Sequence, residues 1–93
     1  MLEIHFNKMN FIFSKHAIEQ MRLRKISQDI IINILNTPDQ ILHADEQIEI
    51  YQSVINETQE LKYLIRVFVN TEMKKIITVY KTSKIEKYYE NKV

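Results

Sequence analysis

The chain has 93 residues, a formal net charge of +1 and 45% hydrophobic residues, which is typical of one small folded domain covering residues 1–93. It contains no cysteine, which excludes disulfides, thiolate metal ligands and a cysteine nucleophile. It also contains no glycine, which excludes the glycine-rich loops that cradle nucleotide phosphates. The three histidines lie far apart in the sequence and show no metal-ligand spacing, so we expect neither a cofactor nor a metal.

Hydropathy along the chain predicts a soluble, cytoplasmic protein with no membrane partner. Glu3, His5 and Lys8 interrupt the N-terminal apolar residues before these reach the length of a signal-peptide core. No later stretch approaches the roughly 20 apolar residues that span a membrane.

Charge is distributed unevenly along the chain. Residues 1–37 carry a net charge of +2, residues 38–60 carry −6, and residues 61–93 carry +5. Such asymmetry can build a polarised surface with one side suited to phosphate. The alternative is that these charges are scattered over solvated faces.

The first half of the chain predicts strand structure followed by two short helices. Apolar residues at positions 2–13 indicate one or two strands. Ser14 has the features of an N-cap, so we expect a helix from there to about residue 25. Ser27 repeats the arrangement, and the second helix must end near residue 36 because Pro38 disfavours a helical residue before it.

After Pro38 the apolar period changes from helical to alternating. Three strand faces are expected: Ile48, Ile50, Gln52 and Val54; then Leu61, Tyr63, Ile65, Val67 and Val69; then Ile77 and Val79. A further short strand is compatible with residues 40–43, and residues 83–90 suit a last helical turn or two against the sheet edge. The predicted fold class is α+β: an N-terminal strand, two helices on one sheet face, an antiparallel β-meander of three to four strands, and a short C-terminal helix.

Two groups of polar residues could carry chemistry. On the first helix His16, Gln20 and Arg24 are spaced four residues apart and form one polar stripe, although this spacing alone favours a surface or capping histidine. Arg66 alternates with apolar residues in its strand, and Thr78 and Tyr80 lie on the polar face of the next strand, so these three could converge.

The C-terminal stretch TVYKTSKIEKYY, residues 78–89, gathers three lysines and three tyrosines. Lysine can contact a phosphate backbone and tyrosine can stack on an unpaired base, as RNA binding requires. Ordinary edge packing of the tyrosines and a solvated lysine edge that discourages sheet aggregation explain the same pattern. The residues alone do not decide between these readings.

Two separated motifs resemble a known family. The run FSKHAIEQMRLRKIS (residues 13–27), a helix ending in N-T-P, and the later ITVYKTSKIEKY (residues 77–88) are similar to a small bacterial domain-of-unknown-function family. That family is grouped with the RelE/ParE-like and BrnT-like toxins of the barnase–EndoU–colicin–RelE (BECR) superfamily. The resemblance covers about residues 13–88 and implies a RelE/ParE-like fold.

The resemblance also suggests site residues. His16 matches the family histidine and Arg24 the arginine before I-S. The C-terminal motif is matched by Tyr80, Thr82, Ser83, Lys84, Lys87 and Tyr88. One departure is Gln20, where the family pattern has arginine; a neutral amide cannot clamp a phosphate bidentately.

Together these features lead us to expect the toxin of a toxin–antitoxin system, a metal-independent endoribonuclease acting on mRNA. In this hypothesis His16 is the general base or acid, Arg24 and Arg66 are the phosphate stabilisers, and Tyr80 or Tyr88 is a stacking group or proton donor. The expected RNA contacts are Thr82, Ser83, Lys84, Lys87 and Tyr88, with Lys84 also at the catalytic centre. Expected partners are a cognate antitoxin and RNA, free or ribosome-bound.

Relatives with the implied fold do not all cut RNA, since some poison a topoisomerase. A first alternative is therefore a non-catalytic RelE/ParE-like binding module that inhibits a protein target such as gyrase. A second is a degenerate member kept for protein binding.

Overall fold

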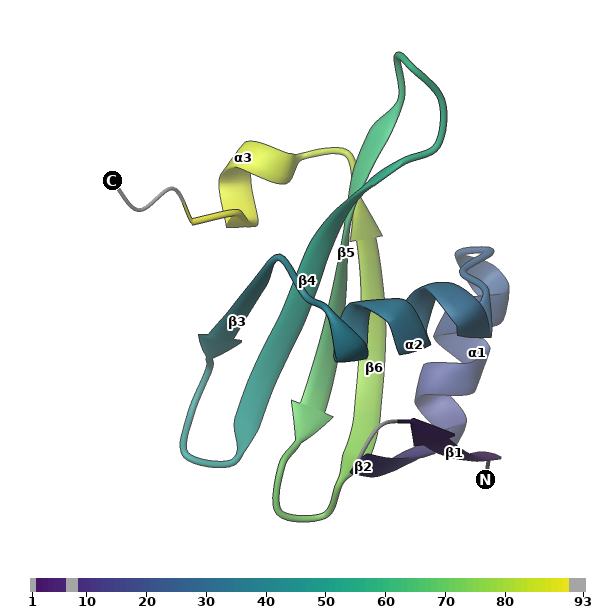
Figure 1. Cartoon of the computed structure of the whole chain (residues 1–93), viewed down its shortest axis with the longest axis vertical. Coiled ribbons are helices and arrows are strands. Elements are labelled where there is room, and N and C mark those ends of the chain that lie inside the picture. The colour runs from purple at the N-terminus through teal and green to yellow at the C-terminus, as the bar shows by residue number, and fades with distance from the viewer. Residues whose placement is uncertain (1, 7–8, 91–93) are drawn as a thin grey trace.

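The computed structural model describes residues 2–6 and 9–90 (Figure 1). In chain order the elements are β1 (Leu2–Phe6), β2 (Met9–Phe13), α1 (Lys15–Leu23), α2 (Gln28–Asn36), β3 (Gln40–His43), β4 (Ile48–Asn56), β5 (Lys62–Asn70), β6 (Lys75–Thr82) and α3 (Ile85–Tyr88). The predicted α+β class is confirmed.

The strands form one six-stranded sheet in the order β1-β2-β6-β5-β4-β3. Strands β3 to β6 follow one another with antiparallel pairing. The N-terminal residues form a hairpin, β1 with β2, and β2 then pairs parallel to β6, with Phe13 opposite Ile76. The sheet as a whole is therefore mixed rather than purely antiparallel.

Both helices begin at their predicted serine caps. The Ser14 hydroxyl oxygen accepts a 2.9 Å hydrogen bond from the Ala17 N–H, and the Ser27 hydroxyl oxygen accepts one of 3.3 Å from Ile30. α1 ends at Leu23 rather than at about residue 25, because the backbone turns at Lys25 through the left-handed conformation.

That turn is at Lys25, which has a φ of 55°. The Ile26 N–H donates a 2.9 Å hydrogen bond to the carbonyl of Met21, and this bond closes the end of the helix. Glycine usually occupies this position because it carries no Cβ, but the chain contains none.

The hydrophobic core lies between the two helices and one face of the sheet. α1 contributes Ala17 and Met21, and α2 contributes its Ile31, Ile34 and Leu35 stripe. The sheet side of the core consists of Tyr51, Ile65, Val67, Val69, Ile76 and Val79, with Phe11 and Phe13 from β2. The expectation that both helices cover one sheet face is confirmed.

One predicted strand face is wrong. The alternation predicts Ile77 and Val79 on one face, but a register shift next to Phe68 places Ile76 opposite Val69 instead. Ile76 is fully buried, whereas Ile77 is partly exposed. The bulge leaves Tyr80 opposite Arg66 on the other face of the sheet.

The C-terminal helix α3 lies on the side of strands β4–β6 away from α1 (Figure 1). Residues 83–90 were expected against the sheet edge, but they pass over this second face: the Tyr88 carbonyl accepts from Gln52, and the backbone of Glu90 exchanges hydrogen bonds with the Gln40 side chain. Within residues 2–6 and 9–90, no helix has the length and apolar character needed to cross a membrane.

Candidate functional site

A row of polar side chains crosses the sheet face opposite α1 and α2. Gln40 of β3 is opposite Gln52 of β4, Gln52 is opposite Arg66 of β5, and Arg66 is opposite Tyr80 of β6. Because directly opposite residues point to the same side of a sheet, all four project from one face. Polar residues on four neighbouring strands therefore meet in one line.

Hydrogen bonds fix the centre of this row. The Nε–H of Arg66 donates a 2.9 Å bond to Oε1 of Gln52, and Nε2 of Gln52 donates a 2.8 Å bond to Oε1 of Gln40. Gln52 is 0% exposed, so its amide is a rigid support beneath the arginine. Burial lowers the pKa of Arg66, whereas Tyr88 and Tyr80 raise it. The guanidinium group nevertheless stays charged at neutral pH, as arginine does in proteins.

α3 places Tyr88 above Arg66. The guanidinium carbon lies 4.4 Å from the centre of the Tyr88 ring. The rings of Tyr80 and Tyr88 meet edge to face, with centroids 5.9 Å apart and an interplanar angle of 78°. Lys87 adds a further positive charge, with Nζ 5.4 Å from the centre of the Tyr88 ring.

These neighbours acidify Tyr88. A hydrogen bond with Tyr80 is the largest effect and lowers the pKa of Tyr88. Desolvation, the next largest, raises it, and the charges of Lys87 and Arg66 lower it further. The Tyr88 phenol therefore releases its proton more readily than an ordinary tyrosine, because its pKa is lowered.

Arg24 reaches the same site from the C-terminal end of α1. Its guanidinium carbon lies 4.6 Å from the centre of the Tyr80 ring. Its Nε–H donates a 3.1 Å hydrogen bond to Oε1 of Gln20, and its Nη1 donates one of 3.3 Å to the carbonyl of Lys81. We call Arg24, Arg66, Tyr80 and Tyr88 the arginine–tyrosine cluster. Its two rings meet each other, and each arginine lies against one of them.

The residues after β6 border this cluster. Thr82 is buried, and its hydroxyl oxygen accepts a 3.0 Å bond from the Lys84 N–H, so this side chain shapes the turn. Ser83, Lys84 and Lys87 are exposed and line a surface hollow together with the rest of residues 83–87. Two exposed ammonium groups are thus available beside the cluster.

The structure does not bring His16 to the cluster. His16 is exposed at the first turn of α1, where it lines a hollow with Asn70, Met73 and Lys75 at the opposite end of β6. Arg24 follows it by eight positions, which corresponds to about 12 Å along the helix axis.

Two members of the polar row were not predicted as site residues. Gln40 and Gln52 support Arg66, but only their place in the sheet register shows this. The available signal was a glutamine within the apolar strand sequence IEIYQSVI, because a buried amide requires partners.

The comparison that gives a match is with protein-family models. The chain matches neither a curated protein nor a solved structure. A family model described as "Domain of unknown function (DUF4258)" matches residues 13–81, which include Arg24, Arg66 and Tyr80. Since this match covers most of the chain, the protein belongs to that domain-of-unknown-function family.

Proposed function

We propose that the arginine–tyrosine cluster binds and cleaves RNA, and that the protein is the toxin of a toxin–antitoxin system with a RelE/ParE-like (BECR) fold. The observation that carries this proposal is the placement of Arg24 and Arg66, from separate elements, on either side of the Tyr80–Tyr88 pair. Cations on both sides of a pair of aromatic rings suit a ligand that carries phosphates next to bases.

Each group has a part in holding RNA. A guanidinium group binds a phosphate through two parallel N–H bonds, and both arginines are held in place by glutamine side chains. Lys84 and Lys87 contact the RNA backbone, while Ser83 can donate its hydroxyl to a phosphate oxygen. The tyrosine rings stack on an unpaired base.

Cleavage needs only groups of this kind. Solvent hydroxide removes the proton of the 2′-hydroxyl, the 2′-oxygen attacks phosphorus, and the bond from phosphorus to the 5′-oxygen breaks. Tyr88 gives its proton to the leaving 5′-oxygen and regains one from water, so the products are a 2′,3′-cyclic phosphate and a 5′-hydroxyl. Arg24 and Arg66 stabilise the charge that builds on the phosphate oxygens.

The proton donor in this proposal is Tyr88 rather than His16. The motif resemblance implies His16 as base or acid, but the side chain lies at the far end of α1. A phenol whose pKa is lowered toward the working pH is a better general acid than an ordinary tyrosine.

The test is cleavage of total and ribosome-bound RNA by the purified protein in EDTA. Tyr88→Phe and Arg66→Lys are expected to reduce the rate by about 10²-fold or more, the scale of one general acid or one charge-stabilising donor. His16→Ala is the control and should retain activity. Loss of activity in His16→Ala with wild-type rates in Tyr88→Phe would overturn this assignment.

A second candidate is a non-catalytic module that inhibits a protein target such as gyrase. It is favoured by the engagement of Arg66 with the chain's own Gln52 and Tyr88, which lets the cluster serve as a rigid basic surface. A binding module would keep its affinity for the target in Tyr88→Phe and would leave RNA intact.

Under either function we propose a cognate antitoxin as partner. An acidic segment of that protein would cover the basic face around Lys84 and Lys87. The antitoxin should therefore block both RNA binding and RNA cleavage at equal stoichiometry.

A further inference from the structure

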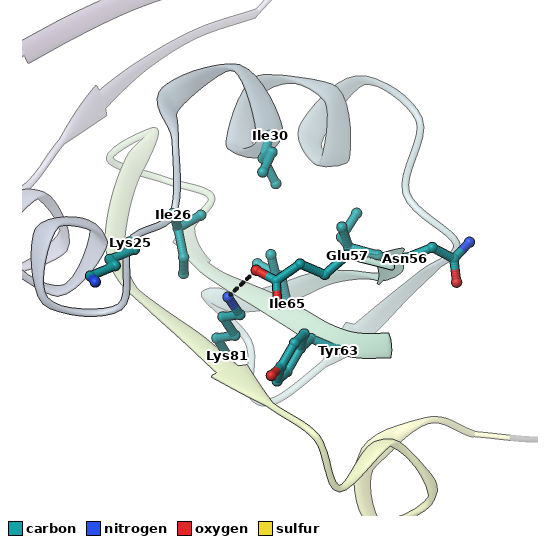
Figure 2. A pocket seen from close by; sticks show the side chains of 9 residues that line it. Lys25, Ile26, Ile30, Asn56, Glu57, Tyr63, Ile65 and Lys81 are labelled. Atoms are coloured by element: carbon teal, nitrogen blue, oxygen red, sulfur yellow. Dashed lines mark hydrogen bonds and ion pairs between the residues drawn. The ribbon is translucent and has the colours of Figure 1, made fainter. Parts of the chain in front are cut away.

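A separate cavity of about 200 Å³ lies on the helix-covered side of the sheet (Figure 2). It is enclosed by the turn between α1 and α2, by α2, and by the ends of β4, β5 and β6. Its lining consists of Lys25, Ile26, Ile30, Ile55, Asn56, Glu57, Tyr63, Ile65 and Lys81. None of these residues belongs to the arginine–tyrosine cluster.

The walls of this cavity are mainly isoleucine. Ile26 and Ile65 are buried in the core, while Ile30 and Ile55 are only half-buried and keep apolar surface toward the cavity. Figure 2 shows Ile30 pointing from α2 toward this space. An apolar cavity of about 150 Å³ is large enough to hold benzene, so this one can accept a single aromatic ring.

The mouth carries one ion pair, between Lys81 and Glu57, and Lys25 stands at its rim. Nζ of Lys81 lies 3.5 Å from Oε1 of Glu57 and 4.5 Å from the centre of the Tyr63 ring (Figure 2). Lys25 is exposed, and among the described residues no carboxylate pairs with it. Figure 2 shows the Lys25 ammonium directed away from Lys81, but its exposed four-carbon stem can turn toward the mouth and add a positive charge there.

The chain's own Glu57 shows what this mouth accepts. Its half-exposed side chain brings a carboxylate to Lys81 above the isoleucine walls. A free acid could place its carboxylate at Lys81, where Lys25 can turn to meet it, while its apolar part fills the space below.

We propose that the cavity binds a small organic acid with one aromatic ring and one carboxylate. The ring lies among the four isoleucines and the carboxylate lies at Lys25 and Lys81. This site is independent of the RNA-cleaving function proposed above.

The experiment is a titration of the methyl-labelled isoleucine protein with phenylacetate, followed by nuclear magnetic resonance. The methyl signals of Ile26, Ile30, Ile55 and Ile65 should shift together and saturate, while that of the distant Ile41 should not move. Phenylacetamide, which has the same ring without the charge, should bind more weakly.

Two lysines provide matched variants. Lys25 and Lys74 are both exposed and both have positive φ, at 55° and 52°, but only Lys25 lines the cavity. Lys25→Gln should weaken phenylacetate about two- to fivefold, the scale of one exposed charge pair, and Lys74→Gln should change nothing. Ile30→Phe, which fills the cavity from a half-buried position, should abolish the shifts.

Three results would overturn the proposal. The first is an absence of saturable shifts in the four methyl groups of the wild-type protein. The second is equal affinity for phenylacetamide and phenylacetate, and the third is undiminished binding in Ile30→Phe that remains folded. Because the readout involves no RNA, failure here leaves the RNA-cleaving function to be judged by its own experiment.

Discussion

The Nε–H of Arg66 donates a 2.9 Å hydrogen bond to Oε1 of Gln52, whose side chain is wholly buried beneath it. An arginine next to an apolar sheet surface would otherwise leave both its own donor and the amide oxygen unsatisfied. The pair therefore links the stability of the sheet to the orientation of a candidate phosphate-binding group.

Replacing Arg66 with leucine should lower the free energy of unfolding by about 1–3 kcal/mol, because the buried Gln52 oxygen loses its donor. The double variant Arg66→Leu with Gln52→Leu should be more stable than the sum of the two single losses predicts, with a coupling of about 0.5–3 kcal/mol. Urea unfolding followed by circular dichroism measures all four proteins. Simple additivity would show that the bond contributes nothing specific.

The acidified tyrosine predicts a particular pH dependence. If Tyr88 gives up a proton in the reaction, the cleavage rate should fall once this phenol ionises, at a pH below the ordinary tyrosine value of about 10. Lys87→Gln should move this alkaline fall to higher pH, because it removes a positive charge that favours the phenolate. The measurement is the pH–rate profile, accompanied by a phenolate absorbance titration in which Tyr88→Phe identifies the component.

The same lowered pKa has a defined sign for stability. The folded chain releases the Tyr88 proton before the unfolded chain does, so this group adds stability as the pH rises through its folded pKa. Its contribution is complete above the unfolded value and is lost as the pH falls again. For the pH–rate profile, an alkaline fall at the same pH in wild type and Lys87→Gln would show that the charge of Lys87 does not lower the pKa of Tyr88.

Phosphate contacts by Lys84 and Lys87 should be visible in the salt dependence of RNA binding. Each contact with a single strand contributes about 0.7 to the slope of log affinity against log salt. Lys84→Gln should reduce the slope by about this amount, and Lys84→Gln with Lys87→Gln by about twice as much. Fluorescence anisotropy of a labelled oligonucleotide, measured over a range of salt concentrations, gives the slopes.

Lys15→Gln is the matched control for this series, because Lys15 is also exposed but lies at the other end of α1. It should leave the slope unchanged. An equal effect of all three lysines would mean that RNA is attracted by overall charge rather than held at the arginine–tyrosine cluster.

Local signals in the sequence were sufficient for the helix starts and the strand faces near the site. Ser14 and Ser27 cap their helices because a cap depends on residues within one turn. Alternation placed Arg66 and Tyr80 on the polar side of adjacent strands, and the register then paired them directly. The α+β class follows from the same periodicities.

Features that depend on distant pairing were not predictable. The bulge beside Phe68 moved Ile76 into the core in place of Ile77, although both isoleucines fit the apolar pattern equally well. The position of residues 83–90 over the sheet face depends on hydrogen bonds to Gln40 and Gln52, and no periodicity encodes these contacts. The distance of His16 from the cluster likewise follows from which end of α1 lies near Lys81.

Gln20 occupies the position where the resembling family has arginine, and in the structure its Oε1 accepts from the Nε–H of Arg24. Gln20→Arg removes this acceptor and places two positive charges one helical turn apart, which should cost about 0.2–0.5 kcal/mol of stability. It also adds a second guanidinium beside Arg24, so RNA affinity and the cleavage rate should both rise. Thermal unfolding and RNA binding of the same preparation measure the two opposite effects.

The control is Gln28→Arg, which adds the same charge at an exposed position of α2 and should not raise the cleavage rate. If Gln20→Arg instead weakens RNA binding, the amide is required to hold Arg24 over Tyr80, and the glutamine is part of the site rather than a lost arginine. If RNA affinity rises without cleavage, the cluster is a binding surface, which favours the non-catalytic candidate. A rise in both, confined to Gln20→Arg, means that the site still lacks one phosphate clamp that its chemistry can use.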